Sequence, residues 1–140
     1  MIKPEVLGMV ANSVNNPVLT SASAVPNYSF LTDNGIVYLI ANTLSGDDSY
    51  VDDVTFAAGE YLNGFDVAAW VDQKLVIDER HIAYGSGEDF DDITAGTTVL
   101  VIDSGKLKIG SAPQSGVYFK VTDKLTGIGG NRVKARVMVA

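Results

Sequence analysis

Few side chains in this chain are of a type that catalyses reactions. His81 is the one histidine, and there is no cysteine. A Ser-His-Asp triad needs a histidine that a carboxylate orients toward a nucleophile, and no serine lies in a Gly-x-Ser-x-Gly motif. The lack of cysteine excludes thiolate catalysis, thiolate metal sites and disulfides. The sequence therefore predicts no catalytic residue, and we interpret His81 as a partly exposed structural side chain.

Carboxylates are abundant and come in short clusters, at 47–48, 52–53 and 88–92. A calcium site needs several oxygens that converge on one point, and the segment GSGEDFDDITAG lacks the spacing of an EF-hand loop. A glycosidase needs two carboxyl groups about 5–10 Å apart across a cleft, usually in a larger chain. We interpret the clusters as solvated turns, and expect no metal and no cofactor.

The sequence Gly127-Ile128-Gly129-Gly130 is the richest in glycine. A dinucleotide-binding loop follows a strand and opens a helix, whereas here the next segment has the pattern of a strand. We therefore predict a hairpin turn.

Charge is distributed unevenly along the chain, whose net charge is −7. Residues 1–103 contain 3 basic and 16 acidic residues, and residues 104–140 contain 7 basic residues and one acid. The acidic total argues against a nucleic-acid partner, which needs a basic face. Such asymmetry is typical of a surface that meets an opposite charge, in a second copy or in a large acidic assembly. Neutralisation of the two halves within one fold is the other interpretation.

Short strands separated by turns dominate the pattern. The dipeptide Asn34-Gly35 predicts a tight turn before an apolar strand at 36–40. A second strand is expected at 51–58. Two similar segments, 75–85 and 100–110, each predict a hairpin. Strands are also expected at 116–121 and at 132–139. The last alternates strictly, with valine and alanine on one face and basic residues on the other.

One helix is predicted over residues 63–74. Val67, Trp70 and Val71 share a face at the i, i+3, i+4 spacing, with Trp70 as the anchor. Asp66 near the start and Lys74 near the end suit the helix dipole.

These elements predict an α+β, mostly β fold: a compact barrel-like or sandwich domain of short antiparallel strands with one short helix. Residues 1–30 are rich in proline and polar residues and are expected to form an extended N-terminal arm, followed by a β-rich domain at 31–140. The uncharged segment 6–32 contains too many polar residues for a membrane-spanning helix, so no membrane association is expected.

The arm and the basic strand are the candidate contact regions. The outward face of the strand fits either a protein contact or an edge protected by charge against aggregation. The candidate residues for a contact with a larger assembly or a sister subunit are Pro4, Val6, Leu7, Val10, Val14, Pro17, Leu19, Arg132, Lys134 and Arg136.

Three segments carry a resemblance to a known group of proteins: AAGEYLNGFDVAAWVDQKLVIDERHIAYG (57–85), DDITAGTTVLVIDSGKLKIG (91–110) and SGVYFKVTDK (115–124). They resemble small proteins encoded beside the major capsid gene in tailed phages of Gram-positive bacteria. The resemblance implies a structural virion protein made in the bacterial host cytoplasm, which binds the outside of the capsid as a head decoration protein and stabilises it. It also implies an arm that orders on the capsid, the major capsid protein as partner, and frequent self-association as a homotrimer.

The chain departs from lambda-type decoration proteins in its length and in the helix expected near Trp70. Two other functions stay open. One is another phage structural subunit, such as a tail tube, head fibre or adaptor protein. The other is a small ligand-binding or carbohydrate-binding β module, which would need exposed aromatic side chains among Tyr28, Tyr50, Tyr61, Tyr84 and Tyr118.

Overall fold

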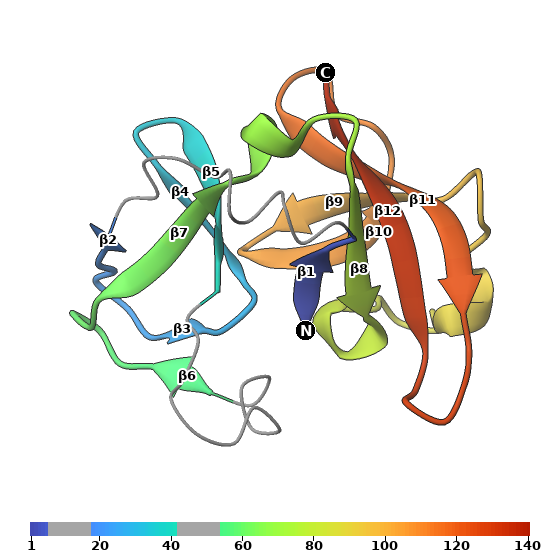
Figure 1. Ribbon diagram of the computed structural model, residues 1–140, viewed down its shortest axis with the longest axis horizontal. Helices are drawn as coiled ribbons and strands as arrows, with labels where there is room; N and C mark the ends of the chain where they lie inside the picture. The colour runs from blue at the N-terminus through green and yellow to red at the C-terminus, as the bar shows by residue number, and fades with distance from the viewer. Residues whose placement is uncertain (6–17, 42–53) are drawn as a thin grey trace.

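The computed structural model describes residues 1–5, 18–41 and 54–140. The described chain forms two groups of strands that lie side by side, joined at the top of Figure 1 by the segment between β7 and β8.

The larger group is a six-stranded antiparallel sheet that curls into a half-barrel. Its strands, in spatial order, are β1 (Ile2–Pro4), β8 (Lys74–Asp78), β12 (Arg132–Val139), β11 (Val117–Leu125), β9 (Val99–Asp103) and β10 (Lys106–Gly110). The long hairpin of β11 and β12 extends below the rest of the sheet in Figure 1.

The smaller group is a four-stranded antiparallel sheet with a two-stranded ribbon at its base. The sheet consists of β2 (Val18–Leu19), β7 (Leu62–Asp66), β5 (Ile36–Ile40) and β4 (Phe30–Asp33), and the ribbon of β3 (Val25–Pro26) and β6 (Thr55–Phe56). Single turns of 3-10 helix, η2 (Val67–Trp70), η3 (Glu79–His81) and η4 (Phe90–Asp92), join strands.

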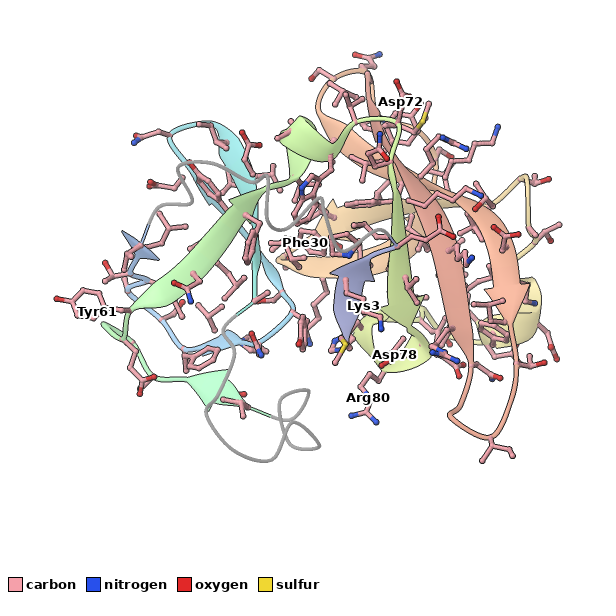
Figure 2. All side chains as sticks on the ribbon, in the orientation of Figure 1. Lys3, Phe30, Tyr61, Asp72, Asp78 and Arg80 are labelled. Atoms are coloured by element: carbon pink, nitrogen blue, oxygen red, sulfur yellow. The ribbon has the colours of Figure 1, made fainter. Side chains whose placement is uncertain are left out.

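One hydrophobic core connects the two sheets. Leu75, Ala135 and Val121 lie opposite one another on β8, β12 and β11 and are fully buried. From the smaller sheet, Phe30 packs against Phe119 of β11, with ring centroids 5.6 Å apart. Figure 2 shows Phe30 in the centre of the molecule, between the sheets. A second, smaller cluster lies within the four-stranded sheet and its ribbon.

The mostly β class is confirmed, as are the two tight hairpins. Asn34-Gly35 joins β4 to β5 and Ser104-Gly105 joins β9 to β10, and all four residues have positive φ. Those backbone angles suit the twist of the paired strands, and asparagine and glycine tolerate them best. The predicted strands at 36–40 and 132–139 have the predicted bounds. Of the strand expected at 51–58, the described part contains β6.

The helix expected at 63–74 is wrong. Strand β7 occupies its first part, η2 makes one 3-10 turn, and β8 begins at Lys74. The Asp66 carboxylate accepts a hydrogen bond from the Ala68 amide and caps that turn. Val67 and Trp70 are buried, but Val71 has extended backbone and is 43% exposed. A helical pattern this short has little stability of its own. The strand pairing of the residues before and after it, in β7 and β8, therefore determines the structure of the segment.

The hairpin expected at 75–85 is also wrong, although that at 100–110 is confirmed. After β8 the chain makes the η3 turn, which contains His81, instead of returning beside β8. Ile82 then forms a parallel bridge with Leu107 of β10. Ser104-Gly105 supplies the positive φ that a two-residue turn needs, and no such pair follows β8.

The arm expected at 1–30 lies only partly within the described residues. Ile2 of β1 is buried and pairs with Ile77 at the edge of the six-stranded sheet. Strands β2 and β3 belong to the smaller group. The boundary after residue 30 stays a prediction, since residues 6–17 lie outside the described residues.

Within the described ranges, no helix has the length and apolar character needed to cross a membrane.

We predict that Phe119→Ala lowers the free energy of unfolding by about 3–5 kcal/mol, because it leaves a cavity in the core that joins the two sheets. Urea unfolding followed by Trp70 fluorescence measures this. Ile128→Ala, at a fully exposed turn position, is the control and should change stability by less than about 0.5 kcal/mol. Equal stability of the two variants would contradict the described core.

Candidate functional site

The outside of the six-stranded sheet collects most of the basic residues of the chain. On β12 the side chains of Val133, Ala135 and Val137 are fully buried, so the residues between them point outward. The same alternation applies to the neighbouring strands. The outward charged residues of β1, β8, β12 and β11, together with Glu5, are here called the basic face. They are the cations Lys3, Lys74, Lys120, Arg132, Lys134 and Arg136 and the acids Glu5, Asp78 and Asp123.

Three cations of this face lie in one row across three strands. Arg136 of β12 is the direct partner of Lys74 on β8 and of Lys120 on β11. Adjacent strands are about 4.8 Å apart, so their side chains stand close together. Like charges directly opposite one another destabilise a sheet. The row is therefore an electrostatic cost that the fold retains.

Only part of this charge is balanced inside the molecule. Arg136 donates from Nη1 to the main-chain oxygen of Asp72, at 2.6 Å. Lys74 Nζ lies 3.4 Å from a carboxylate oxygen of Asp123. Within the described residues, no hydrogen bond or ion pair involves the Lys120 side chain.

A second cross-strand contact ties β12 to the residue after β1. Lys134 Nζ donates to Glu5 Oε1 at 2.6 Å. This hydrogen bond lowers the pKa of Glu5 and raises the pKa of Lys134. On β11, the hydrogen bond from the Thr122 hydroxyl, followed by Lys74, lowers the pKa of Asp123. Thr122 is the extra residue of an irregularity in the β11–β12 register.

The charge is strongly segregated as a result. The basic face has six basic and three acidic side chains, a net charge of +3, whereas the whole chain carries −7. Outside this face, the described residues contain four basic and ten acidic residues, a net charge of −6. Ion pairs such as Lys134–Glu5 and Lys74–Asp123 neutralise part of the charge between the two halves of the sequence. The cations left over on the face suit an acidic partner.

The structure places only some of the predicted contact residues on the basic face. Arg136 is central in the row, Lys134 is engaged with Glu5, and the Nε of Arg132 is buried with no hydrogen-bond partner in the described part. Pro4 and Leu19 are buried within their own sheets. The others, Val6, Leu7, Val10, Val14 and Pro17, lie outside the described residues.

Sequence analysis did not identify three members of the basic face: Lys3, Lys74 and Lys120. A usable signal existed for Lys120, because it lies between the inward-facing Phe119 and Val121 in a period-2 strand. Pairing that strand with the strand at 132–139 would have placed Lys120 beside a basic residue. Lys74 was assigned to the end of a helix, which concealed its place on the sheet.

His81 lines a groove of about 360 Å³ between the two sheets, together with Tyr28, Ser29, Arg80 and Lys106. The His81 ring packs edge-on against Tyr28 at 5.3 Å. The Ser29 hydroxyl donates to the main-chain oxygen of Pro26 at 2.6 Å. The arrangement around Ser29 is that of a structural turn, and His81 is half-buried.

The acidic segment 88–92 stabilises local turns. Glu88 Oε1 accepts a hydrogen bond from the Gly85 amide at 2.6 Å. Asp89 and Asp92 form a capping box around η4. In residues 1–5, 18–41 and 54–140, no group of three or more histidine, cysteine, aspartate or glutamate side chains is placed to hold a metal ion.

The tyrosines do not share one environment. Tyr28 is buried, and Tyr84 is half-buried and donates to Glu79 Oε1 at 3.1 Å; burial, then this bond, raises the pKa of Tyr84. Tyr61 is 77% exposed at the far end of the smaller sheet (Figure 2). Tyr118 lies on β11, and Tyr50 is outside the described residues.

No protein-family description matches this chain, and neither the curated proteins nor the solved structures contain a match to it.

We predict that Lys120→Thr raises the stability of the fold by a few tenths of a kilocalorie per mole, because it removes a cation beside Arg136 and adds a good strand former. The midpoint of urea unfolding measures this. Lys108→Thr is the matched control, because Lys108 Nζ lies 2.7 Å from a carboxylate oxygen of Asp103 and its loss removes a favourable pair. A lower midpoint for Lys120→Thr than for the native protein would show that the row is not a cost.

The Glu5–Lys134 contact predicts a pH-dependent effect of Glu5→Gln. The lowered pKa of Glu5 means that its stabilisation is present above the usual carboxyl range and is lost as the pH falls through the folded-state pKa. The raised pKa of Lys134 means that the contact is also lost at strongly alkaline pH. Glu5→Gln should therefore be less stable than the native protein at neutral pH and equally stable in acid. Urea midpoints across pH test this, and a difference independent of pH would refute it.

Proposed function

We propose that this chain is a structural virion protein of a tailed phage or prophage, which binds the outside of the capsid and stabilises it. The observation that supports the proposal best is the basic face. It is a broad charged surface on the most regular part of the fold, and its six cations exceed the three acids on the same face.

A protein that stabilises a capsid needs a stiff platform and a contact surface. The platform is the half-barrel, whose inner residues are fully buried. Charged contacts give orientation and rapid association more than affinity, and many copies on one particle let weak contacts add up. These requirements favour a charged, rigid sheet face.

The proposed partners are the major capsid protein and other copies of this chain. Arg132, Lys134 and Arg136 are the described contact candidates on β12. Nucleic acid is a poor partner, because the net charge of −7 repels phosphate. The proposed location is the capsid surface, after synthesis in the bacterial host cytoplasm.

The test is co-sedimentation with mature capsids that lack their decoration protein, from the phage or prophage that encodes this chain. We expect saturable pelleting at a fixed number of copies per capsid subunit, and weaker pelleting at high salt, where charges are screened. An unrelated acidic protein of similar size is the control for trapping. Absence of pelleting by folded protein would refute the proposal.

A further inference from the structure

The row of Lys74, Arg136 and Lys120 places three cations side by side on three adjacent strands. A neutral strand former at any of the three positions would relieve the repulsion. Lys120 is exposed at the centre of the sheet surface, and no described acid pairs with it. Surfaces that keep such a cost commonly serve binding, and three adjacent cations require a partner that is acidic.

The rest of the chain itself offers that chemistry. Away from the basic face the described residues carry a net charge of −6, so each copy has both a cationic surface and an acidic one. The same charge disfavours nucleic acid as the occupant, since phosphates would be repelled on every other side.

Among the described residues, the acidic turn η4 of one copy does not lie on the same side of the sheet as the row. Lys124 lies opposite Val133, which is fully buried, and therefore points to the inner side of the sheet. There its Nζ donates to the Phe90 main-chain oxygen at 2.9 Å and lies over the Phe90 ring. The turn η4, with exposed Asp91 and Asp92, is thus attached on the inner side, at the outer edge of β11 (Figure 1). The basic row is on the opposite side.

We infer that the basic face binds the acidic η4 region of a second copy of this chain, in a head-to-tail contact. Such a contact uses two different surfaces of each copy, and it forms rings or rows. It deepens the proposed structural role, on which it rests for its biological purpose, by naming the partner of the basic face.

Sedimentation velocity of the isolated protein at low ionic strength and at about 1 M salt tests this contact, because screening shortens the reach of charges from about 30 Å at 0.01 M to about 3 Å. The native protein should associate at low salt and dissociate at high salt. The double variant Lys120→Glu/Arg136→Glu should associate at least tenfold more weakly. Asp91→Lys, which leaves the capping box of Asp89 and Asp92 intact, should also weaken the association.

Mixing the two reversed variants gives the decisive result, because each then presents one complementary surface to the other. We expect the mixture to form a complex that neither variant forms alone. Lys106→Glu/Lys108→Glu places two reversals on β10, an edge strand that β9 separates from β11 and the row. It is the matched control and should associate like the native protein. Circular dichroism of each variant verifies folding.

A native protein that stays monomeric at low salt would overturn the inference, as would folded reversed variants that fail to associate when mixed. Binding of a short duplex DNA by a monomeric native protein would identify nucleic acid as the occupant instead. Capsid co-sedimentation separates the two proposals: saturable pelleting by a protein that does not self-associate removes this inference and leaves the proposed function standing.

Discussion

The pairing register of β12 with β8 and β11 determines both sides of the six-stranded sheet at once. Because side chains alternate along a strand, a shift of one residue would move Val133, Ala135 and Val137 to solvent and bury the basic residues between them. Burial of unpaired cations is very costly, so the apolar inner side enforces the register. The basic row on the outer side follows from the same constraint.

The smaller sheet depends on this framework. Phe30 and Leu39 belong to the cluster that includes Phe119 of the half-barrel, and the Phe30 amide donates to the Gly105 main-chain oxygen at 2.9 Å. Gly105 has positive φ, and a Cβ there would lie 2.9 Å from the Phe30 oxygen. The tight β9–β10 turn thus serves two purposes: it closes a hairpin and lets the smaller sheet approach.

Local signals predicted those parts of the fold that local physics determines. Asn34-Gly35, Ser104-Gly105 and the alternation of 132–139 each specify a geometry within a few residues, and all three are confirmed. The segment 63–74 was misassigned because its helical spacing spans one turn, while the pairing of Lys74 with Arg136 is a contact between distant residues. The row of Lys74, Arg136 and Lys120 could not be predicted from the sequence for the same reason. Its members come from three strands, and only the pairing register of those strands brings them together.

The composition of the basic face indicates the kind of contact it can make. The large apolar side chains most exposed among the described residues, such as Val18, Tyr61 and Ile128, lie in other parts of the fold. A face of charged groups on long side chains gains little from burying apolar area, and its contacts weaken as salt screens them. Two of its cations, Lys134 and Lys74, already have carboxylate neighbours, which leaves Lys3, Lys120, Arg132 and Arg136 to gain from an acidic partner. Such a surface suits an assembly held by many weak, reversible contacts, in which the number of copies supplies the strength that one contact lacks.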